Sequence, residues 1–134
     1  MILLDTNACI AALNGRPRLV GERIGAAIAE RREVAVSTIG LFELWCGIAK
    51  STHIDRNIRT LETFLDPLKV LAFDSDDGRI AGDIRATLER GGGPIGPYDY
   101  LIAAQALRRN LTLVTANEKE FSRVGGLRWE NWAG

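Results

Sequence analysis

The chain is poor in the residues that several common classes of protein site require. Among its 134 residues are one histidine, His53, and two cysteines, Cys9 and Cys46, which lie far apart in the sequence. This set offers no zinc-ligand spacing, and a single histidine excludes mechanisms that need a pair. We expect both cysteines to be reduced residues of the core.

Long apolar runs and an excess of charge of either sign are absent as well. No run approaches the roughly 20 apolar residues that cross a bilayer, and "MILLD" is too short for a signal-peptide core. We therefore expect a cytoplasmic protein that makes no contact with a membrane. Seventeen basic residues balance seventeen acidic ones, so binding of nucleic acid would need a local basic patch. Candidates are Arg16, Arg18, Lys50, Arg85, Arg108 and Arg109, although scattered arginines more often form a solvated surface.

What is present is an alternation of short apolar runs and amphipathic segments. The apolar runs predict strands at residues 1–4, 34–37, 68–73 and 111–115, with an edge strand or tail at 127–132. The amphipathic segments predict helices, among them 6–15, 18–33, 54–65 and 78–93. Ser37 or Thr38 is expected to cap another helix, with an apolar stripe of Leu41, Leu44, Trp45 and Ile48. This order is typical of an α/β fold with helices on both faces of a parallel sheet, here as a single domain over residues 1–134.

Polar residues directly after the predicted strands are candidates for a binding site. Ligands of open parallel sheets bind beyond the carboxyl ends of the strands. Asp5 follows the first strand, and Thr115 and Asn117 stand at and after the end of the strand at 111–115. Taken alone, Asp5 suits the N-cap of the next helix as well as it suits a ligand.

Asp99 lies at the start of a mostly apolar helix, behind Gly96 and Pro97. An acid in a first helical turn is favoured by the helix dipole, so a capping role accounts for it equally well. The stiff approach leaves the carboxylate little freedom, however, and this favours a fixed ligand.

Glu43 lies in the middle of a predicted helix, between Gly40 and Gly47. Each glycine costs a helix roughly 1 kcal/mol relative to alanine. The two glycines either leave room for a group that approaches Glu43 or allow close packing of helices.

Three carboxylates in one cleft would repel one another and have raised pKa values unless a cation lay among them. Oxygen ligands without histidine or thiolate favour Mg²⁺ or Mn²⁺. Such a site is typical of phosphate chemistry.

Four segments of the chain resemble one known family. They are "LLDTN", "FELWCGI", "GPIGPYDYLIAAQAL" and "LVTANEKEFSRVGGLRWENW", and in this order they are similar to the PIN-domain ribonuclease toxins called VapC, of VapBC type II toxin–antitoxin systems. The resemblance covers essentially the whole chain. It implies a three-layer α/β/α sandwich, a Mg²⁺-dependent endoribonuclease activity, usually a homodimer, and neutralisation by a VapB antitoxin. Contact with DNA would be only indirect, through the antitoxin complex.

The resemblance also assigns residues. The metal-binding acids fall on Asp5, Glu43 and Asp99, with Thr6 and Thr115 as supporting positions. The family's fourth acid falls on Asn117, and Glu120, one helical turn on, would compensate for it. We expect Asp5 and Asp99 to hold the metal and Glu43 to position or deprotonate the attacking water. Asn117 with Thr115 would orient the metal's water shell or the substrate phosphate, while Asp74, Asp76 and Asp77 are interpreted as helix caps.

The sequence is thus interpreted as a toxin that hydrolyses a phosphodiester bond in structured RNA, with tRNA as the foremost substrate class. One alternative is a catalytically inactive PIN domain that only binds RNA or protein. Another is a Mg²⁺-binding receiver domain of signalling proteins. A receiver would need paired acids after its first strand, where this chain has only Asp5, and a lysine after its last.

Overall fold

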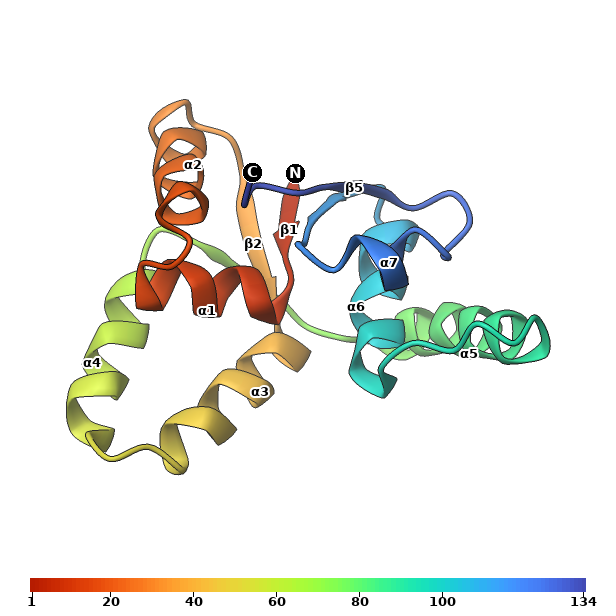
Figure 1. Cartoon of the computed structure of the whole chain (residues 1–134), viewed down its shortest axis with the longest axis horizontal. Coiled ribbons are helices and arrows are strands. Elements are labelled where there is room, and N and C mark those ends of the chain that lie inside the picture. Colours follow the sequence, from red (N-terminus) through yellow and green to blue (C-terminus); the bar gives the residue numbers. More distant parts are fainter.

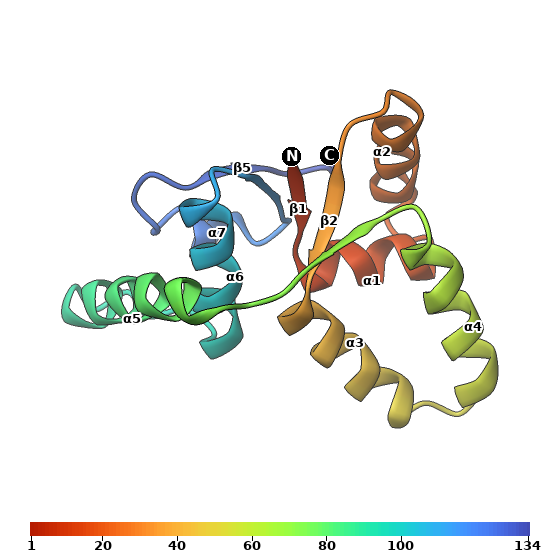
Figure 2. The ribbon, with the colours of Figure 1, turned by 180° about the vertical axis from the view of Figure 1, so that it is seen from behind.

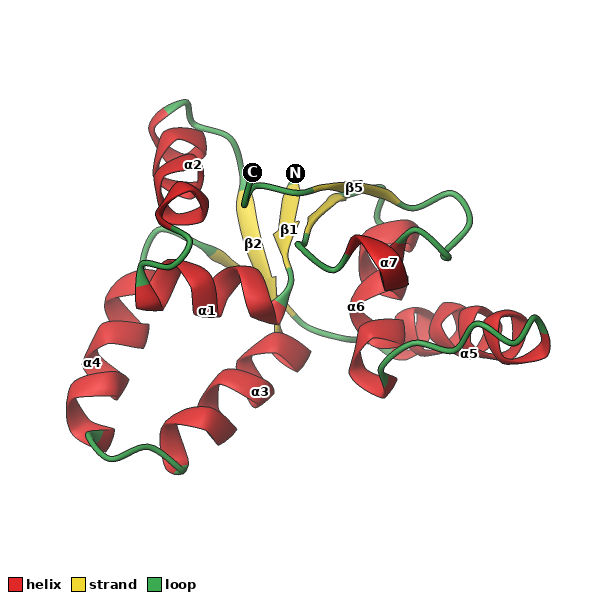
Figure 3. Ribbon diagram, viewed as in Figure 1, coloured by secondary structure: helices red, strands yellow, loops and turns green.

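The computed structural model describes residues 1–134 and contains one sheet of five parallel strands (Figures 1 and 3). The strands are β1 (Ile2–Leu4), β2 (Val34–Ser37), β3 (Lys69–Leu71), β4 (Thr112–Val114) and β5 (Arg128–Glu130). Their order is β3-β2-β1-β4-β5, and every neighbouring pair is parallel. The predicted parallel sheet is confirmed, with β5 as an edge strand. Receiver-type sheets follow the order 2-1-3-4-5, so the strand order excludes that alternative.

Seven helices form two layers on either side of the sheet (Figures 1 and 2). Strand side chains alternate between the faces. Ile2 and Leu4 belong to a core cluster with residues of α1 (Thr6–Asn14), α2 (Arg18–Ala29), α3 (Thr38–Ala49) and α4 (Ile54–Leu65). Leu3 points to the opposite cluster, with residues of α5 (Ser75–Arg90), α6 (Pro97–Arg108) and α7 (Glu118–Phe121). The predicted three-layer α/β/α sandwich is confirmed. None of its helices is long and apolar enough to cross a membrane.

The order in which the strands are added to the sheet reverses between β1 and β4. Strands β1 to β3 extend to one side, whereas β4 returns to pair with the other side of β1. Leu4 lies opposite Val114, and the Asp5 N–H donates to the Val114 carbonyl over 3.0 Å. A reversal of this kind opens a crevice at the carboxyl ends of the two strands. The fold therefore places the residues that follow β1 and β4 where a ligand can bind.

Local signals in the sequence explain most helix ends. Gly15 adopts a left-handed conformation (φ 69°) and ends α1, and Pro97 occupies the first position of α6. Ser37 rather than Thr38 caps α3, because its hydroxyl accepts the Ile39 N–H over 2.9 Å. Helix α2 ends at Ala29, earlier than predicted, and the short helix α7 was not predicted at all.

Two predictions about α3 are wrong. Cys46 is exposed and not a core residue, and Trp45 of the predicted apolar stripe is also exposed. Helix α3 touches the sheet only near its start and then runs away from it (Figure 1), so only Gly40 and Leu44 of the helix are buried. The periodicity of the sequence identified a helix, but it could not show how far the helix follows the sheet.

The arginines proposed as an RNA-binding patch are largely engaged in other contacts. Arg108 Nε and Arg109 Nη2 bind the two carboxylate oxygens of Asp77 over 2.7 and 2.8 Å, and Arg108 also pairs with Asp74 over 2.9 Å. Arg85 pairs with Glu89 and lies over the ring of Tyr100. Arg108 and Arg109 join α5 to α6, and Arg85 lies on α5, so these three candidates make contacts within the protein, while a role in RNA binding stays a prediction.

Asp77 does more than the predicted capping. Asp74 and Asp77 form a reciprocal capping box at the start of α5, as expected. Asp77 is also fully buried. Burial by itself would raise its pKa, but hydrogen bonds from Arg109, the Asp74 backbone and Arg108 lower the pKa to about 2. The ionised carboxylate is therefore part of the folded structure.

The first prediction concerns this carboxylate. Because the pKa of Asp77 is lowered on folding, its contribution to stability is present above about pH 4 and is lost as the pH falls toward 2. Asp77→Asn should lower the free energy of unfolding at pH 7 by about 2 kcal/mol, with the difference vanishing near pH 2. Chemical denaturation across this range measures it. Asp76→Asn, one residue earlier and exposed, is the control and should show no such difference. Equal stability of Asp77→Asn and wild type at pH 7 would contradict this account.

Candidate functional site

Asp5 connects β1 to α1 and is almost completely buried, with 3% of its surface exposed. Its Oδ1 accepts the Ala8 N–H over 2.7 Å, so the capping role is real. Burial raises the pKa of Asp5, hydrogen bonds from Thr115 and Ala8 lower it, and the charge of Glu43 raises it again, with a net increase. A helix cap does not need to be buried beside other acids. Capping therefore explains the hydrogen bond to Ala8 but not the burial of Asp5 near Glu43.

Glu43 is held toward the same end of the sheet by Thr6. The Thr6 hydroxyl donates to Glu43 Oε1 over 2.7 Å, which links the start of α1 to α3. A Cβ at Gly40 would lie 3.5 Å from Thr6 Oγ1, an ordinary van der Waals contact, so this position does not require glycine. Gly47 has no atom near its Cβ position and lines a groove. Of the two glycines around Glu43, Gly40 is buried beside Thr6, and Gly47 leaves open space.

Asp99 lies over Gly96 in the first turn of α6. A Cβ on Gly96 would be 2.8 Å from Asp99 Oδ2, closer than such atoms approach, so any other residue at position 96 would displace this carboxylate. The Asp99 N–H donates to the Gly96 carbonyl over 3.0 Å. Tyr100 fixes the preceding loop, because its buried hydroxyl accepts the Ile95 N–H over 3.0 Å. The stiff approach predicted from the sequence is confirmed.

Asn117 and Glu120 complete the group on the side of β4. The Asn117 amide donates to Glu120 Oε2 over 2.7 Å, and its backbone N–H donates to the Thr115 hydroxyl over 2.9 Å. Burial would raise the pKa of Glu120, but hydrogen bonds from Asn117, Asp99 and the Gly96 backbone lower it. Asn117 therefore orients Glu120, and Glu120 extends toward Asp99.

The acids interact electrostatically as one group. Burial raises the pKa of Asp99 to about 7, with further contributions from its hydrogen bond to Glu120 and from the charges of Glu120, Asp5 and Glu43. The same neighbourhood lowers the pKa of Glu120 while it raises that of Asp99, so Asp99 is the acid of this pair that takes up a proton first as the pH falls. None of the ion pairs in the structure involves these four acids. Arg123 is the basic residue whose charge lowers the pKa of Glu120, but it forms no ion pair with that carboxylate, so the site keeps a surplus of negative charge.

This donor set suits a hard divalent cation, because it consists of carboxylate and hydroxyl oxygens. No three acidic, histidine or cysteine side chains lie close enough together to enclose a metal ion by themselves. Mg²⁺ commonly uses only one or two carboxylates and keeps several water ligands, so an open arrangement of this kind fits it.

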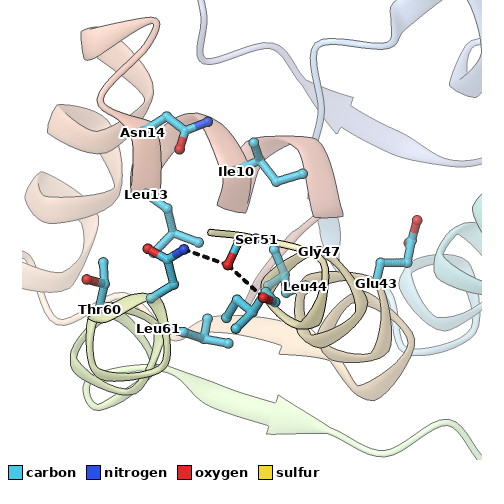
Figure 4. A pocket seen from close by; sticks show the side chains of 11 residues that line it. Ile10, Leu13, Asn14, Glu43, Leu44, Gly47, Ser51, Thr60 and Leu61 are labelled. Carbon is cyan, nitrogen blue, oxygen red and sulfur yellow. Dashed lines mark hydrogen bonds between the residues drawn. The ribbon is translucent and has the colours of Figure 1, made fainter. Parts of the chain in front are cut away.

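A groove extends from Glu43 between α1, α3 and α4 (Figure 4). It encloses about 330 Å³, and its floor includes Leu13, Leu44 and Leu61. At its far end the Asn57 amide donates to the Ser51 hydroxyl over 2.9 Å. The groove is therefore lined by apolar and polar side chains together, and Figure 4 shows the Glu43 side chain pointing away from the other lining residues.

Comparison with known proteins identifies this arrangement. The family model of the PIN domain matches residues 2–127. The chain belongs to the PIN-domain family. This PIN domain is similar to VapC proteins along its whole length: the tRNA(fMet)-specific endonuclease VapC of Shigella flexneri is 40% identical over 131 residues, which are 98% of this chain and 97% of that protein. Ribonuclease VapC2 of Rickettsia felis is 38% identical over 130 residues, 97% of this chain and 96% of the relative.

Solved structures agree. The structure of VapBC2 from Rickettsia felis bound to a DNA fragment of its promoter matches this PIN domain with a TM-score of 0.91 and 38% identity, over 98% of this chain and 99% of that chain. The DNA-bound VapBC structure from Salmonella typhimurium matches with a TM-score of 0.89 and 40% identity, over 98% of this chain and 97% of that chain. Nucleases of this family generally depend on a divalent metal.

The structure brings together all the residues that the sequence singled out in this PIN domain. The charge of Glu43 contributes to the raised pKa values of the buried acids Asp5 and Asp99. Thr6 hydrogen-bonds to Glu43, Thr115 hydrogen-bonds to Asp5, and Asn117 binds Glu120. Sequence reasoning missed that Glu120 contacts Asp99. The spacing of one helical turn between Asn117 and Glu120 indicated that Glu120 could reach the site, but it could not show that α7 directs Glu120 toward Asp99.

The second prediction concerns the effect of Asp99 on the stability of the metal-free protein. Because its pKa is raised on folding, the folded state favours the neutral form, and the free energy of unfolding should fall as the pH rises from about 4 through 7. Asp99→Asn removes this penalty and can still donate to Glu120. In EDTA at pH 8 the variant should be more stable than wild type by roughly 1–2 kcal/mol, after allowance for solvent screening, and equally stable at pH 4.

Denaturation at both pH values measures the difference. Asp83→Asn, an exposed acid on α5 without an ion pair, is the control and should match wild type throughout. An Asp99→Asn protein that is less stable than wild type at pH 8 would show that the carboxylate is not held against repulsion.

Proposed function

We propose that the chain is a single PIN domain that acts as a Mg²⁺-dependent endoribonuclease toxin of the VapC type. It hydrolyses phosphodiester bonds in structured RNA, with tRNA as the substrate class, and Mn²⁺ can replace Mg²⁺. It works in the cytoplasm, where its RNA substrate is found. The proposal is supported by full-length relatives named as tRNA(fMet)-specific endonuclease and ribonuclease.

The observation that carries the proposal is the convergence of four acids at the point where the sheet order reverses. Asp5, Glu43, Asp99 and Glu120 come from four segments, and no arginine or lysine pairs with them. The raised pKa of Asp99 is the expected consequence of this arrangement. Acids placed so close together do not stabilise the fold. They do form a group of negative oxygen ligands that can bind a cation, which in turn can bind phosphate.

Each residue has a role in this proposal. Asp5 and Asp99 hold the cation, and Glu43, which is oriented by Thr6, positions the attacking water or removes its proton. Glu120 takes the place of the fourth acid, with Asn117 as the residue that orients it and Thr115 as a support for Asp5. When bound, the cation polarises the phosphoryl oxygen, lowers the pKa of a water and stabilises the leaving oxygen.

The partner is a VapB-type antitoxin, and the active form is a homodimer. Structural relatives were solved as VapBC complexes, two of them with DNA. This chain has no net charge and its arginines near α5 and α6 are paired, so contact with DNA is indirect, through the antitoxin. The groove from Glu43 to Ser51 is long and apolar enough to receive an antitoxin segment, and an arginine of that segment would pair with the acids.

The third prediction tests activity and substrate together. Induced expression of the wild-type chain should arrest growth and create new RNA ends that sequencing locates in tRNA. Asp99→Asn should abolish both effects while the protein stays folded, because the variant removes a direct cation ligand. Asp83→Asn serves as the control and should behave as wild type. Growth arrest by Asp99→Asn, or wild-type expression without new RNA ends, would refute the proposed function.

A further inference from the structure

Two aromatic rings stand beside the acidic site and are open to solvent. Phe42 directly precedes Glu43, and Tyr98 directly precedes Asp99. Their ring centroids are 5.5 Å apart with an interplanar angle of 65°, an edge-to-face contact that bridges the starts of α3 and α6. Phe42 is 54% exposed and Tyr98 is 43% exposed. The pair therefore presents aromatic surface immediately next to two of the proposed cation-binding acids.

The candidate site is dominated by acids, which repel phosphates unless a cation is present. Arg123 is near enough for its charge to lower the pKa of Glu120, and it donates to the Pro94 carbonyl over 2.9 Å, whereas Arg108 and Arg109 are paired with Asp77 at the other end of α6. The chain carries no net charge. Because attraction to the RNA backbone is weak here, contacts to bases must supply a larger share of the affinity.

We propose that Phe42 and Tyr98 form a stacking platform for an unpaired base of the RNA substrate, next to the phosphate that is cleaved. This inference rests on the proposed ribonuclease function and adds the form of the substrate to it. A base can stack on an exposed ring only after it has left its own helix, so the platform selects nucleotides in loops or at bulges. Phe42 shares α3 with Glu43, and Tyr98 shares α6 with Asp99, so the ring pair joins the two helices that carry these acids.

The platform also accounts for the contact between the rings. Each ring restrains the other, so little side-chain freedom is lost when a base stacks. A base presents a flat aromatic face whatever its identity, and stacking therefore gives affinity without strong sequence preference. Recognition of a particular RNA would then follow from which loop reaches the site.

The test uses a tRNA(fMet) transcript, with the position of the cut taken from the wild-type reaction. RNA binding is measured in the cleavage-deficient Asp5→Asn background, so that the RNA stays intact. Adding Phe42→Ala or Tyr98→Ala should weaken binding by about tenfold or more, whereas Phe42→Tyr should stay within about threefold. Phe42→Leu keeps apolar volume without an aromatic face, and it should bind as weakly as Phe42→Ala. In the wild-type background the loss should appear in KM rather than in kcat.

A transcript that lacks one base next to the cut identifies the stacked nucleotide. In the Asp5→Asn background, the abasic RNA should bind equally weakly to the protein with Phe42 and to the protein with Phe42→Ala. The missing base and the missing ring remove the same contact. Trp45→Leu, an exposed aromatic residue of α3 three positions further on, is the matched control and should leave RNA binding unchanged.

Three results would overturn the platform. They are wild-type affinity in Phe42→Leu, additive effects of the abasic RNA and Phe42→Ala, and variants that alter dimerisation or antitoxin binding while RNA binding is unchanged. The last result would assign the rings to a protein interface. If the alanine variants fail to fold, the comparison of Phe42→Leu with Phe42→Tyr still decides the matter. A wild-type protein that cleaves no RNA would remove the proposed function itself, which is a distinguishable failure.

Discussion

Mutual repulsion among carboxylates is the constraint around which the rest of this structure is organised. Burial is the largest cause of the raised pKa of Asp99, and its hydrogen bond to Glu120 and the charges of Glu120, Asp5 and Glu43 raise it further. Left to itself, such a group would separate or take up protons. The fold prevents separation by placing each acid on a different rigid element at the point where the sheet reverses.

Each of the four acids is held in place by a different set of neighbouring residues. Thr6 orients Glu43, and Asn117 orients Glu120. Thr115 and the Ala8 N–H hold Asp5. Gly96 leaves room for Asp99. Farther away, Asp77 joins α5 to α6 through Arg108 and Arg109, and this fixes the end of α6 opposite Asp99. Arg108 and Arg109 thus secure the scaffold, and neither pairs with the acids of the candidate site.

Much of this arrangement was accessible from the sequence, and the reasons are local. Strands, caps and the Pro97 helix start depend on neighbouring residues, and the order of strands and helices restricts the topology. The acids were found because they follow strand ends or lie beside glycines. The exposure of Trp45 and Cys46 depends on where α3 leaves the sheet, and the pairing of Arg108 and Arg109 with Asp77 joins residues 31 and 32 positions apart. Such contacts are set by tertiary packing, which periodicity does not report.

Calorimetric titration of the RNA-free protein with Mn²⁺ tests most directly whether the four acids form one cation site. We expect one site, because Asn117 is neutral and a second ion lacks an anionic ligand until the RNA phosphate arrives. Binding at pH 7 should release a proton from the pair Asp99 and Glu120, so the affinity should rise between pH 6 and 8, and Asp99→Asn should weaken it about tenfold or more. No binding to wild type, two sites of similar affinity, or equal affinity in Asp99→Asn would contradict the account.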